Sequence, residues 1–384
     1  MANELNYISG FDRAVVCPCG VKPGDIQTKR LKSGMECFPV SGCGGGSYAR
    51  VIFNKNVIKE MASLLFSGRF SAGRAHELLF FAKNAANIYA SLKNLPYLKD
   101  AGSVTIYSYW FYDEAAAGAL LKGCLEKHGK RVRLVSRAHG FDIHAERAKY
   151  GYLPMRSFLF KNCDRVFPCS FDGGAVLKKE FPAYADKVRV SRLGTEDHGV
   201  KYGSRKKFRI VSCSYIVPVK RLNLIAEALG KADFPVIWTH IGSGPLEQEV
   251  RSAAAALPEC VRCEFKGAME NAEIMDYYKK SDISVFVNVS SSEGIPVSIM
   301  EACSFGIPVV ATGVGGTREI VREGENGFLL DKDFTADEFI DKLKAVRDLS
   351  DTEYERMCKK SRLIWQDGFS AEKNYGEFYG VLAK

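Results

Sequence analysis

The sequence of 384 residues contains no apolar run close to the roughly 18–20 residues that a helix needs to cross a bilayer. Its first ten residues, MANELNYISG, are polar and include an acid, so they do not have the pattern of a secretory signal. Internal repeats and low-complexity tracts are also missing. We therefore expect a cytoplasmic chain whose contact with a membrane, if it makes one, is peripheral, at the inner face.

Paired cysteine motifs are missing too, although the chain has twelve cysteines. Cys260 and Cys263 form a single CxxC without the second pair that a zinc site would need. A second group of four also lacks paired spacing: Cys17, Cys19, Cys37 and Cys43. Because several cysteines lie inside apolar, strand-like runs, we expect buried free thiols rather than disulfides or metal ligands.

Convincing metal motifs are missing outside the cysteines as well. Asp331 and Asp333 match a D-x-D pattern, but they follow a predicted strand where a turn is expected, and aspartate is a common turn residue. The segment GCGGGS at 42–47 has the composition of a phosphate loop without its GxxxxGK[ST] spacing, so we predict a surface loop. We therefore expect no metal and no cofactor.

The charge balance is moderately positive, at +9 from 54 basic and 45 acidic side chains. Such an excess fits anionic partners, which include phosphorylated ligands and anionic membrane surfaces. No basic stripe is interleaved with aromatic residues, so nucleic acid is not an expected partner. The apolar stretch 76–93, HELLFFAKNAANIYASLK, is a candidate for membrane contact, and an ordinary core-facing helix is the alternative.

Short apolar, β-rich runs alternate with amphipathic stretches along most of the chain. The runs predicted as strands are 13–18, 103–109, 131–140, 164–170, 208–215, 235–242, 282–290 and 307–312. Strands and helices that alternate at this spacing predict parallel sheets covered by helices. A polar break at 196–207 predicts a linker between two α/β domains, 1–200 and 201–365, and we expect residues 366–384 to form a helix that packs back on the N-terminal domain.

The most informative segment is SEGIPVSIMEACSFGIPVVAT at 292–312. After a predicted strand, Glu293 and Gly294 occupy a strand-to-helix loop, and Pro296 is suited to the first helical position. The helix should end at Gly306, and its N-terminal N–H groups would form a site for a diphosphate. Glu301 falls about one turn into this helix, where a carboxylate can accept hydrogen bonds from a diol.

Two glutamates with seven residues between them, across a strand–loop–helix unit, resemble the signature of retaining glycosyltransferases with the GT-B fold. More narrowly, the sequence resembles glycosyltransferase family 4, which builds bacterial surface polysaccharides. The flanking segments that carry the resemblance are IGSGPLEQE at 241–249, FKGAMENAEIMDYYKKSDISVFVNVS at 265–290 and TGVGGTREIVREGENGFLL at 312–330, which includes Glu319. The resemblance implies two Rossmann-like parallel-sheet domains that face a central cleft.

The resemblance also implies roles for individual residues. Glu301 would bind the donor ribose, and Lys220 would neutralise the leaving diphosphate. Glu293, Gly294 and Ile295 would hold the transferred sugar and the phosphates. Gly242 lies in the segment that resembles the family's glycine turn before the donor site, and Gly267 in the segment that resembles its base-binding strand, so both are also expected to bind the donor.

Two neighbouring positions depart from the family. The family usually has Gly-Arg ahead of the lysine, and this chain has Ser214-Tyr215 instead. One of two expected phosphate-binding cations is therefore missing, and Arg221 is the residue expected to replace it.

In the N-terminal half, SRAHGFDIHAERAKYG resembles the family segment that carries an active-site histidine. His139 follows a predicted strand, so it is expected to face the cleft and to contact the donor sugar or the acceptor oxygen. Asp142, His144 and Arg147 are candidates for the acceptor side. The beginning of the chain resembles the family's first helix and second strand, which leads us to expect that the opening strand is missing, with a less stable N-terminal domain as the consequence.

The sequence therefore predicts a retaining, metal-independent glycosyltransferase of the hexosyltransferase type. Its donor would be a UDP- or GDP-linked sugar, and its acceptor a saccharide, expected to be lipid-linked, in surface polysaccharide biosynthesis. Two alternatives stay open at this point. One is a truncated or non-catalytic nucleotide-sugar-binding protein, and the other is a nucleotide-sugar epimerase of similar architecture.

Overall fold

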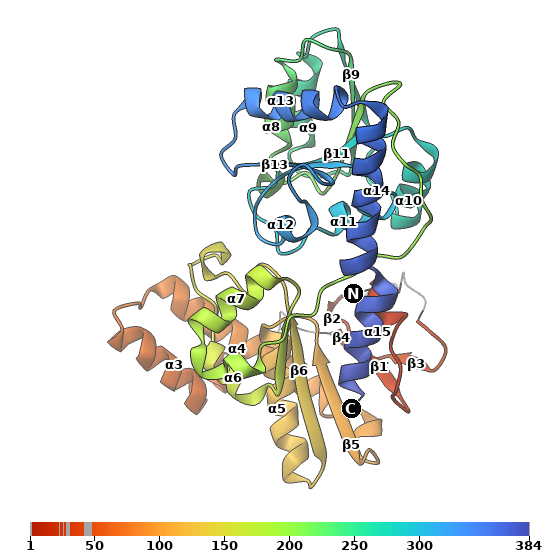
Figure 1. Cartoon of the computed structure of the whole chain (residues 1–384). Coiled ribbons are helices and arrows are strands. Elements are labelled where there is room, and N and C mark those ends of the chain that lie inside the picture. The colour runs from red at the N-terminus through yellow and green to blue at the C-terminus, as the bar shows by residue number, and fades with distance from the viewer. Residues whose placement is uncertain (1, 23, 26, 28–30, 42–47, 384) are drawn as a thin grey trace. The chain divides into compact units, whose positions relative to one another are not determined.

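The computed structural model describes residues 2–22, 24–25, 27, 31–41 and 48–383 (Figure 1). The glycine-rich segment 42–47, including Cys43, lies outside the described residues. The chain divides into two compact units, which we call unit 1, Met1–Ser191 with Gly376–Lys384, and unit 2, Arg192–Tyr375. Each unit combines parallel strands with helices, so the predicted α/β fold class is confirmed.

Unit 1 is built from short parallel sheets and a layer of helices. Its strands are β1 (Ala14–Val16), β2 (Cys19–Val21), β3 (Met35–Cys37), β4 (Val40–Ser41), β5 (Ser103–Ser108), β6 (Arg131–Ala138) and β7 (Arg165–Pro168). Its helices are α1 (Ala2–Leu5), α2 (Ala49–Ile52), α3 (Lys55–Phe66), α4 (Ala72–Leu92), α5 (Asp113–Lys127), α6 (Arg156–Asn162) and α7 (Phe171–Glu180), with 3-10 turns at Pro96–Leu98, Ala145–Arg147 and Pro182–Lys187. The main sheet has the order β5-β6-β7, and β1 pairs with β3 and β2 with β4. Strands β2 to β4 were not predicted, because they are only two or three residues long and carry no clear alternation.

The long helix α4 covers the predicted membrane-contact stretch 76–93. It buries Leu78, Phe81 and Ile88 in the core of unit 1, together with the polar Lys83 and Asn84. The core-facing alternative is therefore confirmed for this helix. The expectation that an opening strand is missing stays a prediction.

A buried ion pair fixes the start of the chain to the main sheet of unit 1. Glu4 of α1 accepts hydrogen bonds through Oε1 from Arg137 Nε and from the Tyr107 hydroxyl, each at 2.9 Å. Both charged side chains are at most 1% exposed, and the guanidinium of Arg137 also donates to the Ser191 carbonyl and lies over the Phe378 ring. Because two desolvated charges compensate each other here, losing either partner would leave the other uncompensated.

Unit 2 contains one parallel sheet with the strand order β10-β9-β8-β11-β12-β13. Its strands are β8 (Arg209–Cys213), β9 (Val236–Ile241), β10 (Val261–Phe265), β11 (Val285–Asn288), β12 (Val309–Thr312) and β13 (Gly327–Leu330). Its helices are α8 (Leu222–Leu229), α9 (Glu247–Ala255), α10 (Asn271–Lys280), α11 (Val297–Ser304), α12 (Thr317–Ile320), α13 (Ala336–Arg347) and α14 (Asp351–Gly368), with a 3-10 turn at Pro218–Lys220. Strands β11 and β12 are buried along their whole length, as apolar strands covered on both faces should be.

The boundary between the units differs from the predicted one. It falls after Ser191, and the polar stretch 196–207 that we expected to be a linker packs along unit 2. There the Lys201 amide donates to the Phe305 carbonyl, and the Arg205 guanidinium donates to the carbonyls of Arg347 and Leu349. The polar composition of this stretch predicted an exposed linker. The sequence alone does not show that its polar groups form hydrogen bonds with backbone carbonyls of unit 2.

The last helix, α15 (Ala371–Leu382), begins in unit 2 and ends in unit 1. Within unit 1, the Phe378 ring packs edge-on against Tyr107 and Phe167, and Arg133 donates to the Val381 carbonyl at 2.9 Å. No helix in the described part of the chain is long and apolar enough to cross a membrane.

Candidate functional site

The order of the strands in unit 2 fixes where a ligand site can form. From β8 the chain runs outward through β9 and β10, and it then returns to β11 on the other side of β8. The loops that leave the carboxyl ends of β8 and β11 therefore diverge, which opens a crevice at this switch point. Lys220 follows β8, and Glu293 follows β11, so the two predicted residues lie on the two sides of the switch point.

Lys220 and Glu293 form an ion pair in which Nζ lies 2.7 Å from Oε1. Asn288, the last residue of β11, donates to the same carboxylate oxygen at 3.2 Å. Glu293 is largely buried and Lys220 is half-buried. The pair places a positive and a negative group at one point of the crevice, where a ligand that carries both hydroxyl and phosphate groups could engage them.

The backbone at Glu293 and Gly294 is supported by the glycine-rich loop that follows β12. The Gly316 amide donates to the Gly294 carbonyl at 3.0 Å. Gly315 has a φ of +50°, and a Cβ there would lie 2.0 Å from the Glu293 carbonyl oxygen. Only glycine allows so close an approach with this backbone conformation. The predicted closing loop therefore positions the loop that holds Glu293 and Gly294 directly.

Helix α11 begins close to its predicted start. Pro296 is the N-cap rather than the first helical residue, and the helix runs over Val297–Ser304. Gly306 follows the end of the helix with a φ of +80°, as predicted, and its amide donates to the Cys303 carbonyl. The first turn of α11 carries N–H groups without intrahelical partners, which is a favourable place for an anion. Gly294 and Ile295 immediately precede this turn.

Glu301 is the fifth residue of α11 and is only 8% exposed. Its Oε1 accepts a hydrogen bond from Asn271 Nδ2 at 2.7 Å, and Asn271 is the first residue of α10. Burial raises the pKa of Glu301 from 4.5 to about 7, and the bond from Asn271 acts in the opposite direction. A buried carboxylate with one neutral partner retains lone pairs that a diol could engage.

The Arg221 side chain is held by backbone carbonyls. Its guanidinium donates to the carbonyls of Val289 at 2.8 Å and Lys332 at 2.7 Å, and it lies over the Phe334 ring. The Arg221 backbone is left-handed, with a φ of +50°, between the 3-10 turn and α8. These contacts join the loops after β8 and β11. A phosphate contact for Arg221 stays a prediction, since two carbonyls already engage the side chain.

The two predicted donor-site glycines lie at the ends of β9 and β10. The Gly242 amide donates to the Gly267 carbonyl at 2.8 Å. A Cβ on Gly242 would lie 1.9 Å from the Ser214 carbonyl oxygen, so this glycine lets the loop after β9 approach the loop after β8. Tyr215 stands in the latter loop with 61% of its side chain exposed, where the family usually has arginine.

His139 of unit 1 directly follows β6, as predicted. Its amide donates to Asp142 Oδ1 at 2.6 Å, and its ring lies against those of Tyr109 and Trp110, at centroid distances of 4.5 and 4.4 Å. Neither ring nitrogen has a hydrogen-bond partner within the described part of the chain. Burial, with a smaller contribution from Arg137, lowers the pKa of His139 to about 3, so the ring is neutral at pH 7.

The other acceptor-side candidates differ in their surroundings. Asp142 is completely buried and accepts the amides of His139 and Phe111, so it shapes the backbone rather than facing a ligand. His144 lies 3.2 Å from Glu146 and 3.7 Å from Asp172. Arg147 ends the 3-10 turn Ala145–Arg147. Asp142 thus has a structural explanation, whereas the roles of His144 and Arg147 stay predictions.

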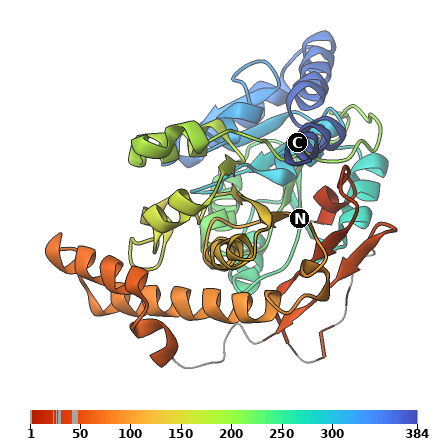
Figure 2. The ribbon, with the colours of Figure 1, turned by 90° about the horizontal axis from the view of Figure 1, so that it is seen from below.

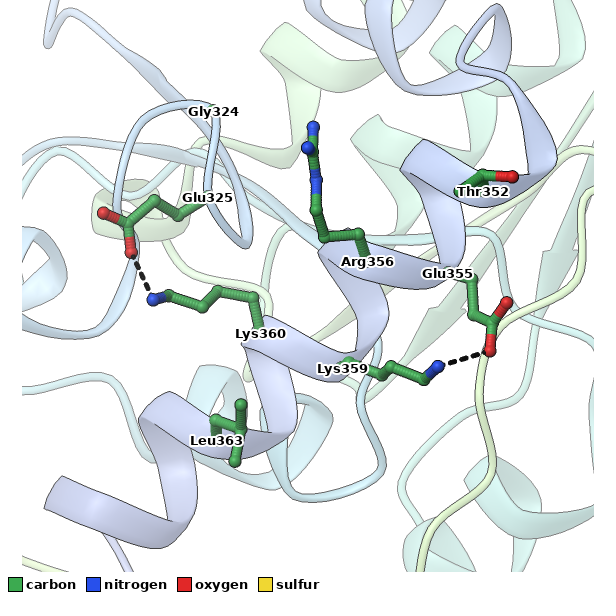
Figure 3. Close-up of a pocket in the computed structure, with 8 residues that line it drawn as sticks. All are labelled: Gly324, Glu325, Thr352, Glu355, Arg356, Lys359, Lys360 and Leu363. Carbon is green, nitrogen blue, oxygen red and sulfur yellow. Dashed lines mark ion pairs between the residues drawn. The ribbon is translucent and has the colours of Figure 1, made fainter.

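No group of three or more His, Cys, Asp or Glu side chains with metal-binding geometry occurs among the described residues. Asp331 and Asp333 lie in a turn, as predicted. None of the eleven cysteines that the structure describes forms a disulfide. Figure 3 shows a pocket of about 630 Å³ on α14 of unit 2, where Lys359 pairs with Glu355 and Lys360 with Glu325. None of the predicted site residues lines this pocket.

Two residues of the site were missed from the sequence. Asn271 and Asn288 each donate to one of the two predicted glutamates. Asn288 could have been predicted from the sequence, because it is a polar residue at the end of a buried parallel strand, and ligands bind at the carboxyl ends of such strands. Asn271 comes from a separate loop, and only the fold brings it to Glu301.

Residues 195–363 match the family model described as "Glycosyl transferases group 1". The amylovoran biosynthesis glycosyltransferase AmsK of Erwinia amylovora is 30% identical over 158 residues, which are 38% of each chain. The D-rhamnosyltransferase WbpZ of Pseudomonas aeruginosa is 27% identical over 196 residues, 47% of this chain and 49% of that protein. The matched part spans between 38% and 64% of the length of the first three curated relatives.

Solved structures extend the similarity to both units. Sucrose-phosphate synthase from Thermosynechococcus elongatus superposes with a TM-score of 0.70 at 16% identity, over 96% of this chain and 88% of that chain. HepE from Anabaena, solved with UDP and glucose, gives a TM-score of 0.62 at 15% identity, over 91% and 86%. The predicted resemblance to GT-B glycosyltransferases is therefore confirmed at the level of fold and group 1 similarity, whereas family 4 in particular stays a prediction.

Proposed function

We propose that this chain is a retaining glycosyltransferase that moves a hexose from a UDP- or GDP-linked sugar to a saccharide acceptor in surface polysaccharide biosynthesis. Among the relatives, AmsK is described as an amylovoran biosynthesis glycosyltransferase, and HepE, which has a similar fold, was solved in complex with UDP and glucose. This support concerns the class of reaction. The base, the sugar and the linkage depend on contacts that similarity at this level does not define.

The observation that carries the proposal is the arrangement at the switch point of unit 2. Glu301 offers a buried acceptor for a ribose diol, and the first turn of α11 offers backbone donors for a diphosphate. Lys220 and Glu293 lie together at the ends of the loops from β8 and β11. A nucleoside diphosphate sugar carries a diol, a diphosphate and a polar sugar ring, so each part of the donor meets a group of matching chemistry.

Within this proposal, Lys220 stabilises the negative charge that develops on the leaving diphosphate. Such a preorganised cation, aimed at the developing charge, is often the largest single contribution to catalysis. The N-terminal turn of α11 adds further positive potential. The reaction would then need no metal ion, because these groups supply the positive charge themselves. Glu293 would orient the transferred sugar through its hydroxyl groups.

The acceptor side is proposed to lie in unit 1, with His139 as the contact to the sugar or the acceptor oxygen. Its neutral imidazole can accept a hydrogen bond from a hydroxyl, because burial disfavours the imidazolium. The acceptor is proposed to be lipid-linked, and the chain to act in the cytoplasm at the inner face of the membrane.

A second candidate, a nucleotide-sugar-binding protein without transferase activity, is favoured by Tyr215. This exposed side chain replaces the arginine that the family places beside the leaving diphosphate, and Arg221 is engaged with carbonyls. One phosphate cation would then be present where related enzymes have two. Binding would survive this change better than catalysis.

The test is an assay of nucleotide release and product formation with UDP- and GDP-hexoses, using a panel of nitrophenyl glycosides as acceptors and EDTA in parallel. The proposal predicts a new glycoside whose anomeric configuration, read by NMR, equals that of the donor, with no effect of EDTA. An inverted product or an absolute need for a divalent cation would contradict it. Tight donor binding without turnover would favour the second candidate, and a changed sugar from donor alone would indicate an epimerase.

A further inference from the structure

The ion pair between Arg192 and Glu319 joins two parts of unit 2 that are far apart in the sequence. Arg192 is the first residue of unit 2, and Glu319 lies in α12, directly after the glycine-rich loop that follows β12. Arg192 Nε lies 3.1 Å from Glu319 Oε2, and the two side chains are 26% and 12% exposed. Because the carboxylate is largely withdrawn from water, solvent screens this pair less than an exposed one.

Arg192 is supported by a well-packed part of unit 2. Its guanidinium lies over the Phe369 ring, 4.9 Å from the ring centre, and Phe369 is buried at the end of α14. Next to it, the Thr195 amide donates to the Phe369 carbonyl, and the Ala371 amide donates to the Thr195 carbonyl, each at 3.0 Å. The segment that enters unit 2 therefore runs beside the junction of α14 and α15 (Figures 1 and 2).

A continuous series of hydrogen bonds leads from this pair to the candidate site. Arg192 Nε donates to the Glu319 carboxylate, and the Glu319 amide donates to the Gly316 carbonyl at 3.1 Å. The Gly316 amide then donates to the Gly294 carbonyl at 3.0 Å. Groups linked in this way polarise and position one another. A shift of the Glu319 side chain would therefore be passed on to the loop that holds Glu293 and Gly294.

From these contacts we infer that Arg192 is a positioning residue for the donor site, which acts through Glu319 and Gly316 on the backbone at Gly294. The inference rests on the donor site proposed above. It adds a residue that lies outside residues 195–363, the part of the chain that matches the family model. Small displacements of groups that orient a ligand can cost much of its binding or turnover, so a residue behind the loop can matter without touching the donor.

A direct contact between the Arg192 cation and the phosphates is the alternative. It makes a different prediction for Glu319. If Arg192 bound the donor itself, loss of the carboxylate would release the cation and leave affinity intact. If Arg192 acts through the pair, loss of either partner has the same effect, because the same series of hydrogen bonds is broken.

The first test is hydrogen–deuterium exchange of the full chain without ligand, read in peptides that cover residues 313–320. In Arg192→Ala and in Glu319→Ala, the Gly316 amide should exchange about fivefold faster or more, because its hydrogen bond to Gly294 opens more often. Glu319→Gln keeps an oxygen that can accept from Arg192, so its exchange should stay close to that of the unchanged chain. Unchanged exchange in Arg192→Ala would overturn the inference.

The second test is isothermal titration with UDP and GDP on the single variants and on R192A/E319A. Nucleotide affinity should fall by about three- to tenfold in each single variant and by no more in the double variant, since both changes act through one pair. Losses that add up in R192A/E319A, or full affinity in Glu319→Ala, would contradict the inference. If the unchanged chain binds neither nucleotide, the proposed function fails, and the exchange of the Gly316 amide alone decides whether Arg192 holds the loop.

Arg209→Ala is the matched control. Arg209 forms an ion pair with Glu264 in the same unit, with Nη1 2.9 Å from Oε2 and both side chains 18% exposed. It is the first residue of β8, so it lies at the opposite end of that strand from the loop that carries Lys220. Thermal unfolding should show at least as large a loss of stability as in Arg192→Ala, whereas Gly316 exchange and nucleotide affinity should be unchanged. Equal changes in both variants would show a general stabilising role and overturn the inference.

Discussion

The candidate site residues of the two units differ in their hydrogen-bond partners and in their surroundings. At the switch point of unit 2, Glu293 is paired with Lys220, and Glu301 with Asn271, so each charged or polar group has a defined partner. In unit 1, His139 is buried between two aromatic rings, and neither of its ring nitrogens has a partner among the described residues. The predicted donor side in unit 2 is thus a preorganised set of polar contacts, whereas the predicted acceptor side in unit 1 is an aromatic setting around one neutral imidazole.

This difference matters for what each unit can be expected to do alone. A preorganised polar site can bind a charged ligand without rearranging, so unit 2 should carry nucleotide binding by itself. An aromatic setting with one hydrogen-bonding group would select a ligand by shape and by a single polar contact. Changes in unit 1 should therefore alter stability or acceptor use, and changes in unit 2 should alter donor binding and the chemical step.

The largest effect is expected from the buried ion pair of unit 1. Glu4→Ala leaves Arg137 buried without its carboxylate, which should cost about 3–5 kcal/mol of the free energy of unfolding. Denaturant unfolding would measure this, and nucleotide binding by unit 2 should be unchanged under native conditions. The control is Glu36→Ala, which breaks the exposed pair with Arg13 and should cost about 1 kcal/mol or less. Equal costs for the two variants would contradict the account of unit 1.

Removal of the lysine at the switch point should have the next largest effect. Lys220→Ala is expected to lower kcat by about 100- to 1000-fold, because one preorganised group at the developing charge is lost. The donor KM should change much less. Lys231→Ala, which removes an exposed lysine paired with Asp337, is the matched control and should leave kcat unchanged. A fall in donor binding as large as the fall in kcat would assign Lys220 to binding rather than to the leaving group.

A smaller effect should follow from a change behind the site. Gly315→Ala places a Cβ 2.0 Å from the Glu293 carbonyl, so the loop that holds Glu293 and Gly294 has to shift. We expect donor affinity to fall by about tenfold, a loss of about 1.4 kcal/mol of binding free energy. Gly324→Ala has a similar positive φ of +71° but open space around it, and isothermal titration should show donor affinity unchanged in this control.

The pH dependence of donor binding should show the mildest effect. Because the pKa of Glu301 is raised to about 7, its carboxylate is protonated below that pH and accepts fewer hydrogen bonds. The Kd for the nucleotide should therefore rise by about tenfold per pH unit below 7 and level off above pH 8. Glu301→Gln should bind weakly at every pH, with no such slope. A wild-type Kd independent of pH between 5.5 and 8 would contradict the role of this carboxylate.

The same raised pKa has a consequence for stability. The folded state holds the Glu301 proton more tightly than the unfolded state, so this contribution to stability is fully present below about pH 4.5 and is lost as the pH rises through about 7. Glu301→Gln removes the loss, so this variant should be more stable than the unchanged chain above pH 7. Glu301 would then be a residue that binding requires at the expense of stability.

Much of unit 2 could be predicted because the sequence patterns that indicate its elements lie close together along the chain. The spacing of Glu293 and Glu301, the strand before them and Gly306 after the helix all lie between Val285 and Gly306, so periodicity and the signals for the helix ends were sufficient. Partners from other loops could not be predicted in this way. Asn271 reaches Glu301 only through the order of the strands, and the engagement of Arg221 with carbonyls depends on a left-handed backbone that the sequence does not indicate.

Unit 1 was less predictable for a physical reason. Its strands β2 to β4 are too short to show alternation, and the burial of Glu4 and Arg137 contradicts the usual expectation for charged residues. His139 was found because it follows an apolar strand, but its aromatic neighbours come from the loop after β5. The stretch 76–93 was a candidate both for membrane contact and for a core-facing helix, because hydrophobicity alone does not distinguish a core helix from an exposed one.

The most direct test of the donor site is thermal unfolding with UDP, GDP and their hexose conjugates, on the unchanged chain and on Glu301→Ala. A ligand that binds only the folded state raises the midpoint according to its saturation. The account predicts an upward shift with one of the two nucleotides and its conjugates, and no shift for Glu301→Ala. An equal shift in both proteins, or no shift with any of these ligands, would contradict a nucleotide-sugar site at Glu301.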